Sequence, residues 1–187
     1  MFGKRKSMHK QSCWDTEQPV IRAKDNETCS DEACAVPTST SDTAKCPVSG
    51  TTGLKVDLIT LKALLNSAAL RRLDGRWYRF CPSVDCDVVY FDNVTNTIFQ
   101  KNDLTVRVGQ KETADPIPIC YCFDFTVENI RRELATQGRI EIPAFIAEEV
   151  KAGHCACEVK NPEGSCCLGK VEKAVKRLQA ELVEAHP

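Results

Sequence analysis

The chain lacks the long apolar segments that mark secreted and membrane proteins. Its first ten residues carry Lys4, Arg5, Lys6, His9 and Lys10, and no apolar run of about 7–15 residues follows, as a secretory signal peptide would require. No stretch approaches the roughly 18 apolar residues that span a bilayer. We therefore expect a cytoplasmic protein with no membrane insertion, in a compartment where thiols stay reduced unless a metal holds them.

The chain also has little excess charge and few aromatic residues. Its 25 Lys and Arg residues face 26 Asp and Glu residues, and aromatic residues make up 6% of the chain. Binding a nucleic acid needs clustered basic residues in excess, so we expect no nucleic-acid partner. Gly-rich phosphate loops, His-Glu-x-x-His and nucleophile elbows are missing too. Enzymatic activity stays an open question, because a metal-reducing redox activity would need none of these motifs.

Cysteine, in contrast, is abundant, with twelve residues in a chain of 187. This content indicates either a disulfide framework or a set of metal ligands, and the missing signal peptide favours metal ligands. Eight of the twelve fall into closely spaced groups, namely Cys81 and Cys86, Cys120 and Cys122, Cys155 and Cys157, and Cys166 and Cys167.

The composition changes along the chain and predicts three segments of an α+β protein. Residues 1–45 are polar, show no apolar period and predict a disordered tail; they carry Cys13, Cys29 and Cys34. Residues 46–115 predict one helix, from Thr60 to near Arg71, and a small antiparallel sheet. The predicted strands are 77–80, 87–91, 97–100 and 104–108.

Residues 116–187 have a helical apolar period and predict helices at about 126–137, 143–153 and 167–183. Thr126 is the expected cap of the first helix, and Pro143 suits the first position of the second. Every cysteine pair of this segment then lies at a helix end or in the adjoining loop. Such a placement suits an iron–sulfur site, because thiolates must converge from several backbone directions while N–H groups offset the negative charge.

Four strings of residues surround the grouped cysteines. They are Phe80-Cys-Pro-Ser-Val-Asp-Cys-Asp-Val-Val-Tyr-Phe91, Val106-Arg-Val-Gly-Gln-Lys-Glu112, Ile119-Cys-Tyr-Cys122 and Asn161-Pro-Glu-Gly-Ser-Cys-Cys167. Together they resemble the N-terminal domain of CopZ-type copper chaperones over about residues 46–170. The C-x-C pair, with further cysteines about thirty-five residues later, also resembles the [2Fe-2S] domain of bacterioferritin-associated ferredoxin.

The resemblance implies a [2Fe-2S] cluster in the C-terminal half. Carried over by motif, its ligands would be Cys120, Cys122, Cys157 and Cys167. Cys155 and Cys166 would then be spare or neighbouring thiols, and the sequence does not decide which of the adjacent Cys166 and Cys167 faces the cluster. His154, beside Cys155, is a further candidate for tuning the cluster or replacing a ligand.

The resemblance also implies a mononuclear zinc ion. Its matching positions are Cys46, Ser49, Cys81 and Cys86, so a serine stands where the family pattern has a ligand. Structural zinc needs four donors. The candidates for the fourth place are Asp85, Asp87, Cys34 and water, and loss or weakening of the site is the alternative.

The implied function is the handling of copper or another thiophilic metal, by one-electron transfer or metal delivery. No Cys-x-x-Cys occurs in the sequence, although the copper-carrying domain of these chaperones presents one. The expected partners are copper or another soft metal ion, and either a metal-transporting ATPase or a separate copper-carrying domain. Two alternatives remain: a structural zinc module that binds another protein, and capture of the cargo metal by Cys29 and Cys34 in the tail.

Overall fold

The computed structural model describes residues 44–74, 77–137 and 139–185. Helices and antiparallel strands both occur in these residues, which confirms the predicted α+β class. No helix in these ranges combines the length and the apolar character needed to cross a membrane. The predicted boundary at residue 115 stays a prediction. The predicted tail lies almost entirely outside the described residues, together with Cys13, Cys29 and Cys34.

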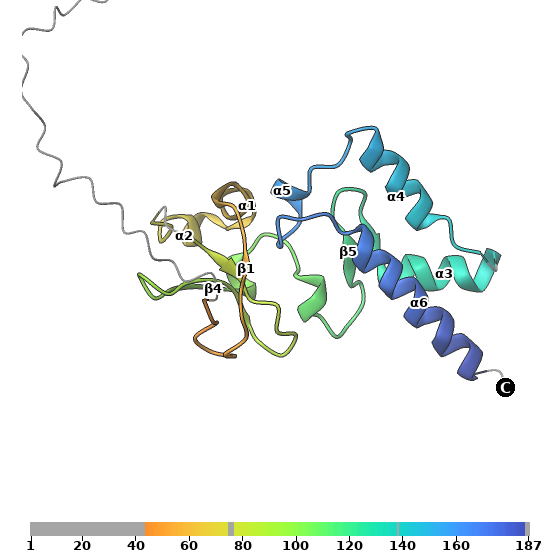
Figure 1. Cartoon of the computed structure of the whole chain (residues 1–187), viewed down its shortest axis with the longest axis horizontal. Coiled ribbons are helices and arrows are strands. Elements are labelled where there is room, and N and C mark those ends of the chain that lie inside the picture. The colour runs from red at the N-terminus through yellow and green to blue at the C-terminus, as the bar shows by residue number, and fades with distance from the viewer. Residues whose placement is uncertain (1–43, 75–76, 138, 186–187) are drawn as a thin grey trace, which may run out of the picture. The chain divides into compact units, whose positions relative to one another are not determined.

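A four-stranded antiparallel sheet occupies the N-terminal half of the described chain (Figure 1). Its strands, in spatial order, are β1 (Leu54–Lys55), β2 (Arg79–Phe80), β3 (Val88–Asp92) and β4 (Thr97–Gln100). Every residue of β3 is buried, because β2 and β4 pair with its edges and both of its faces are covered. Val89 and Tyr90 pack into the main apolar core, whereas Val88 and Phe91 pack against a group of cysteines.

The helix predicted from Thr60 to Arg71 is in fact two helices, α1 (Leu58–Leu64) and α2 (Ser67–Leu70). The break arises at Asn66, whose side-chain oxygen accepts hydrogen bonds from two backbone N–H groups and so caps the start of α2. The apolar spacing runs across this break, which is why periodicity alone merged the two helices.

The strand predicted at 104–108 is wrong. This stretch lies between two 3-10 helices, η1 (Lys101–Asp103) and η2 (Gly109–Lys111), and Leu104 forms only an isolated bridge. Leu104 and Val108 are buried in the main core and Val106 packs against it, whereas Thr105 and Arg107 are exposed. The predicted alternation is therefore present, but the stretch has no strand partner beyond the bridge of Leu104 to Leu65. A Cβ atom at Gly109 would lie 1.8 Å from the carbonyl oxygen of Pro118, so only glycine lets the backbone pass this close.

The C-terminal half is mainly helical. Its elements are β5 (Pro118–Cys120), β6 (Phe125–Thr126), α3 (Val127–Gln137), α4 (Ile142–Lys151), α5 (Cys157–Lys160) and α6 (Leu168–Ala185). The three predicted helices are confirmed within two residues at each end. The Thr126 hydroxyl accepts a hydrogen bond from the N–H of Asn129, as expected of a cap. The short strands β5 and β6 and the single turn α5 were not predicted.

Two side-chain hydroxyls join the two halves. Thr60, buried within α1 and therefore not the predicted cap, donates a hydrogen bond of 2.6 Å to the carbonyl of Glu158 in α5. Tyr90 of β3 donates one of 2.8 Å to the carbonyl of Pro162. Burial raises the pKa of Tyr90, so its side chain stays a neutral donor. These bonds hold the 157–165 segment, which leads into Cys166 and Cys167, against the sheet half (Figure 1).

We expect Tyr90→Phe to lower the free energy of unfolding by about 1–2 kcal/mol, because the buried carbonyl of Pro162 would lose its donor. Tyr78→Phe is the matched control, since the hydroxyl of Tyr78 donates to the carboxylate of Asp74, an exposed residue that water can solvate. Anaerobic denaturant titrations of the two variants measure the difference. Equal stability of both variants would contradict a structural role for this bond.

Candidate metal centres

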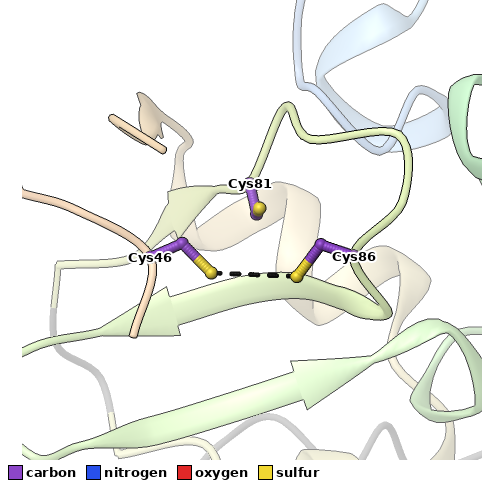
Figure 2. Close-up of side chains that lie close together, drawn as sticks. All are labelled: Cys46, Cys81 and Cys86. Carbon is purple, nitrogen blue, oxygen red and sulfur yellow. Dashed lines mark hydrogen bonds between the residues drawn. The ribbon is translucent and has the colours of Figure 1, made fainter. Parts of the chain in front are cut away.

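Three cysteine side chains converge beside β3, as Figure 2 shows. Cys46 precedes β1, Cys81 directly follows β2, and Cys86 lies just before β3. The sulfurs of Cys46 and Cys86 are 4.0 Å apart, and all three sulfurs lie within 4.8 Å of one another. Their residues are only 2%, 0% and 5% exposed, respectively. We refer to Cys46, Cys81 and Cys86 as the three-thiol group.

Ser49 approaches the three-thiol group from a tight turn. Gly50, at a φ of +70°, donates its N–H to the carbonyl of Cys46 and closes the turn. The turn places the Ser49 hydroxyl oxygen 3.3 Å from the sulfur of Cys81, while the N–H of Thr51 donates to the same oxygen at 3.3 Å. The serine therefore occupies the place of a fourth donor and is held there by the backbone.

The surroundings of Cys46 favour its thiolate. Burial opposes ionisation, but hydrogen bonds from the side chain and backbone of Ser49 and from the backbone of Val48 outweigh it and lower the pKa of Cys46 to about 7. Burial raises the pKa of Cys86. At least one sulfur of the group is thus readily deprotonated, as a metal ligand must be.

The acidic residues proposed for the fourth place do not belong to the site. Among the residues that the structure describes, the group of His, Cys, Asp and Glu side chains close enough to share a metal ion consists of the three cysteines alone. The carboxylate of Asp87 is 73% exposed and pairs with Lys101 at 3.2 Å. Asp85 is exposed as well. Cys34 lies outside the described residues.

Lys111 is a candidate site residue that the sequence did not predict. It lies in η2, is only 4% exposed, and its ammonium group donates to the carbonyls of Ser83 and Cys86 at 2.6 and 2.9 Å. The ammonium also lies 5.8 Å from the ring centroid of Phe80. It therefore fixes the loop between Cys81 and Cys86 and places a positive charge beside three ionisable sulfurs. Lys111 lies in the string Val106–Glu112 that resembles the family, but the sequence does not distinguish a buried lysine from a surface one.

The four predicted cluster cysteines form two pairs. The sulfurs of Cys122 and Cys157 are 3.6 Å apart, and the N–H of Ala156 donates to Cys122 at 3.3 Å. The side chain of Cys167 lies close enough to Cys120 to lower the pKa of its thiol. Cys120, Cys157 and Cys167 are buried, and Cys122 is half-buried. The four thiols thus come from β5, the turn that follows it, α5 and the residue just before α6.

Each pair of thiols is arranged so that its sulfurs interact. The hydrogen bond from Cys167, helped by the backbone of Phe123 and Cys122, lowers the pKa of Cys120 to about 6 despite burial. The same hydrogen bond, with burial, raises the pKa of Cys167. Burial and then the hydrogen bond with Cys122 raise the pKa of Cys157 to about 12. Cys120 accordingly loses its proton more readily than Cys157 or Cys167.

Cys166 and His154 are placed differently from the four paired thiols. Cys167 is 3% exposed and pairs with Cys120, whereas its neighbour Cys166 is exposed. The ring of His154 is turned to Glu149, with its Nδ1 2.8 Å from the carboxylate. Cys167 is therefore inside the core and Cys166 outside it. The sequence alone does not predict which of two adjacent cysteines is buried.

The donor sets suit the two metal groups that the sequence predicts. Two thiolates bound to one tetrahedral metal with bonds of about 2.3 Å lie about 3.8 Å apart. The distances of 4.0 Å between Cys46 and Cys86 and 3.6 Å between Cys122 and Cys157 both match that separation. Three thiols with a hydroxyl beside them fit zinc, and two thiol pairs fit the two irons of a [2Fe-2S] cluster.

Comparisons with known proteins point to one family. The CopZ-type zinc-binding domain matches residues 43–105, which include the three-thiol group and Ser49. The copper chaperone CopZ of Archaeoglobus fulgidus is 34% identical over 148 residues, covering 74% of this chain and 70% of the relative. The crystal structure of the N-terminal domain of that CopZ aligns with a TM-score of 0.58 at 32% identity, over 70% of this chain and 96% of the domain. The chain belongs to the CopZ family.

Proposed function

We propose that this protein handles copper with the help of a [2Fe-2S] cluster, in which Cys120 and Cys167 hold one iron and Cys122 and Cys157 hold the other. The pairing of these four thiols is the observation that supports the proposal most directly. A cluster of this kind supplies a single electron at a time. The cargo is inferred from the relative, whose name is copper chaperone, and from the preference of Cu(I) for thiolates.

The residues around the four thiols would stabilise the charge of the cluster and hold its ligands in place. The N–H of Ala156 directs a positive dipole at the sulfur of Cys122, which would offset the negative charge of a thiolate-bound cluster. The bond from Tyr90 to Pro162 fixes the loop that leads to Cys167. The chain thereby holds the thiols in place and shields three of the four from water.

Zinc at the three-thiol group is the second part of the proposal. This group joins the segment before β1 to the two ends of the β2–β3 connection, so a bound metal would tie these segments together. All nine cysteines that the structure describes are free thiols, which supports work in a reducing compartment such as the cytoplasm. A metal-transporting ATPase or a copper-carrying domain remains the expected partner.

Metal analysis of anaerobically isolated protein tests this function. We expect iron and inorganic sulfide in about equal amounts, near two of each per chain, together with about one zinc. Reduction with dithionite should bleach the visible absorption and give an electron paramagnetic resonance signal of a reduced cluster. A colourless protein with zinc but neither iron nor sulfide would instead establish the alternative, a structural zinc module that binds a partner protein.

A further inference from the structure

We propose that the three-thiol group is an exchangeable metal site, in which Ser49 is a weak fourth donor and from which Cu(I) displaces zinc. The inference deepens the proposed function, because it rests on copper being the cargo and assigns a second place where the cargo binds. It concerns Ser49, whose hydroxyl lies 3.3 Å from the sulfur of Cys81.

The weakness of the fourth donor follows from its chemistry. Structural zinc sites are closed by four donors drawn from thiolates and imidazoles, which bind zinc far better than a neutral hydroxyl does. Ser49 nevertheless stays in position, because Thr51 donates its N–H to the hydroxyl oxygen and the tight turn fixes the backbone. The hydroxyl can therefore complete a zinc site while contributing little to its stability.

The weak donor is also the one that faces solvent. Cys46, Cys81 and Cys86 are buried against Val88 and Phe91. The turn residues 47–50, in contrast, are all exposed. An incoming ion or chelator therefore reaches the site from the side of Ser49. Release of one weak bond on that side opens the coordination sphere without moving any of the three buried sulfurs.

The three sulfurs suit Cu(I) once the hydroxyl has left. Cu(I) is a soft cation that thiolates select, and it is satisfied with fewer ligands than the four of structural zinc. The exchange is balanced: one Zn²⁺ leaves as one Cu⁺ binds, the thiolates stay deprotonated, and no electron is transferred. The product carries one more negative charge than the zinc form, and the buried ammonium of Lys111, bonded to the carbonyls of Ser83 and Cys86, is placed to offset it.

Anaerobic titration of the zinc-loaded full-length chain with Cu(I) tests the exchange. Zinc release is followed with a chromophoric chelator, and bound copper, iron and zinc are measured after desalting. We expect the first copper ion bound by each chain to release one zinc ion, with the iron content unchanged. In Ser49→Cys a fourth thiolate closes the site, so zinc release should slow by about 100-fold. This is the upper end of the effect on metal affinity or activity of mutating a residue that only hydrogen-bonds to a metal ligand.

Two controls make the result specific. Ser67→Cys adds a thiol on α2, which contributes no residue to the three-thiol group, and should release zinc like the unaltered chain. Combined replacement of Cys13, Cys29 and Cys34 by serine should leave copper uptake and zinc release unchanged. Copper uptake without zinc release, loss of uptake in the tail variant, or equal rates for Ser49→Cys and the unaltered chain would each overturn the proposal. An absence of iron and sulfide would contradict the proposed cluster alone, because the zinc-to-copper ratio does not depend on it.

Discussion

Anaerobically isolated Cys157→Ser protein should contain almost no iron or sulfide and should be colourless, whereas Cys155→Ser protein should keep both. The two cysteines are only two residues apart, yet their positions differ. Cys157 is 7% exposed and its sulfur lies 3.6 Å from that of Cys122, while Cys155 is partly exposed and belongs to neither thiol pair. Removing one of the four thiolates leaves an iron with an incomplete set of ligands. Serine does not replace the lost thiolate, because its hydroxyl is not a soft donor.

Zinc content provides the internal control for this experiment. The three-thiol group draws no residue from the C-terminal half, so Cys157→Ser should retain its zinc. Circular dichroism would verify that the helices persist. Full iron and sulfide in Cys157→Ser, or their loss in Cys155→Ser, would show that Cys155 and not Cys157 is the cluster ligand. The pair Cys166→Ser and Cys167→Ser offers the same comparison, with the loss expected only for Cys167.

The fold was predictable where one local rule decided the outcome. The helices α3, α4 and α6 follow from an unbroken apolar period and from caps such as Thr126. Strand β4 lies where predicted, because its residues are β-branched and aromatic between turn residues. The break at Asn66 and the loss of the predicted strand at 104–108 depend on packing against distant segments, such as the bridge between Leu65 and Leu104. A local pattern carries no information on such contacts.

The candidate sites were predictable in their members but not in their geometry. The motifs named the seven cysteines, and the structure brings three of them into one group and four into two pairs. The sequence could not show that Ser49 lies beside Cys81, because this depends on a turn closed by Gly50. Nor could it show that Lys111 is buried, since 25 residues separate it from Cys86 along the chain.

The segment from Arg107 to Glu112 links the two candidate centres. At one end, Lys111 binds the loop that carries Cys81 and Cys86. Two residues earlier, Gly109 donates its N–H to the hydroxyl of Tyr121, which lies between Cys120 and Cys122. A change in this segment should therefore affect the three-thiol group through Lys111 and the thiol pairs through Tyr121.

Lys111→Met should lower the free energy of unfolding by about 2–4 kcal/mol, because the buried carbonyl of Cys86 and the partly buried carbonyl of Ser83 would both lose their donor. Methionine keeps much of the apolar volume, so the loss is specific to the ammonium group. The variant should also bind zinc about tenfold more weakly, as expected when a group that orients a metal ligand is removed. Denaturant titration and competition with a zinc chelator measure the two effects.

Lys101→Met is the matched control, because Lys101 lies in the same part of the chain. Its side chain is 38% exposed and pairs with Asp87 at the surface. A surface pair of this kind contributes about 0–1 kcal/mol, so the control should unfold almost like the unaltered chain and bind zinc equally well. If Lys111→Met matched the control in both measurements, the ammonium would be a bystander to the metal site. A loss of stability in the metal-free protein with unchanged zinc affinity would instead restrict its role to fixing the loop.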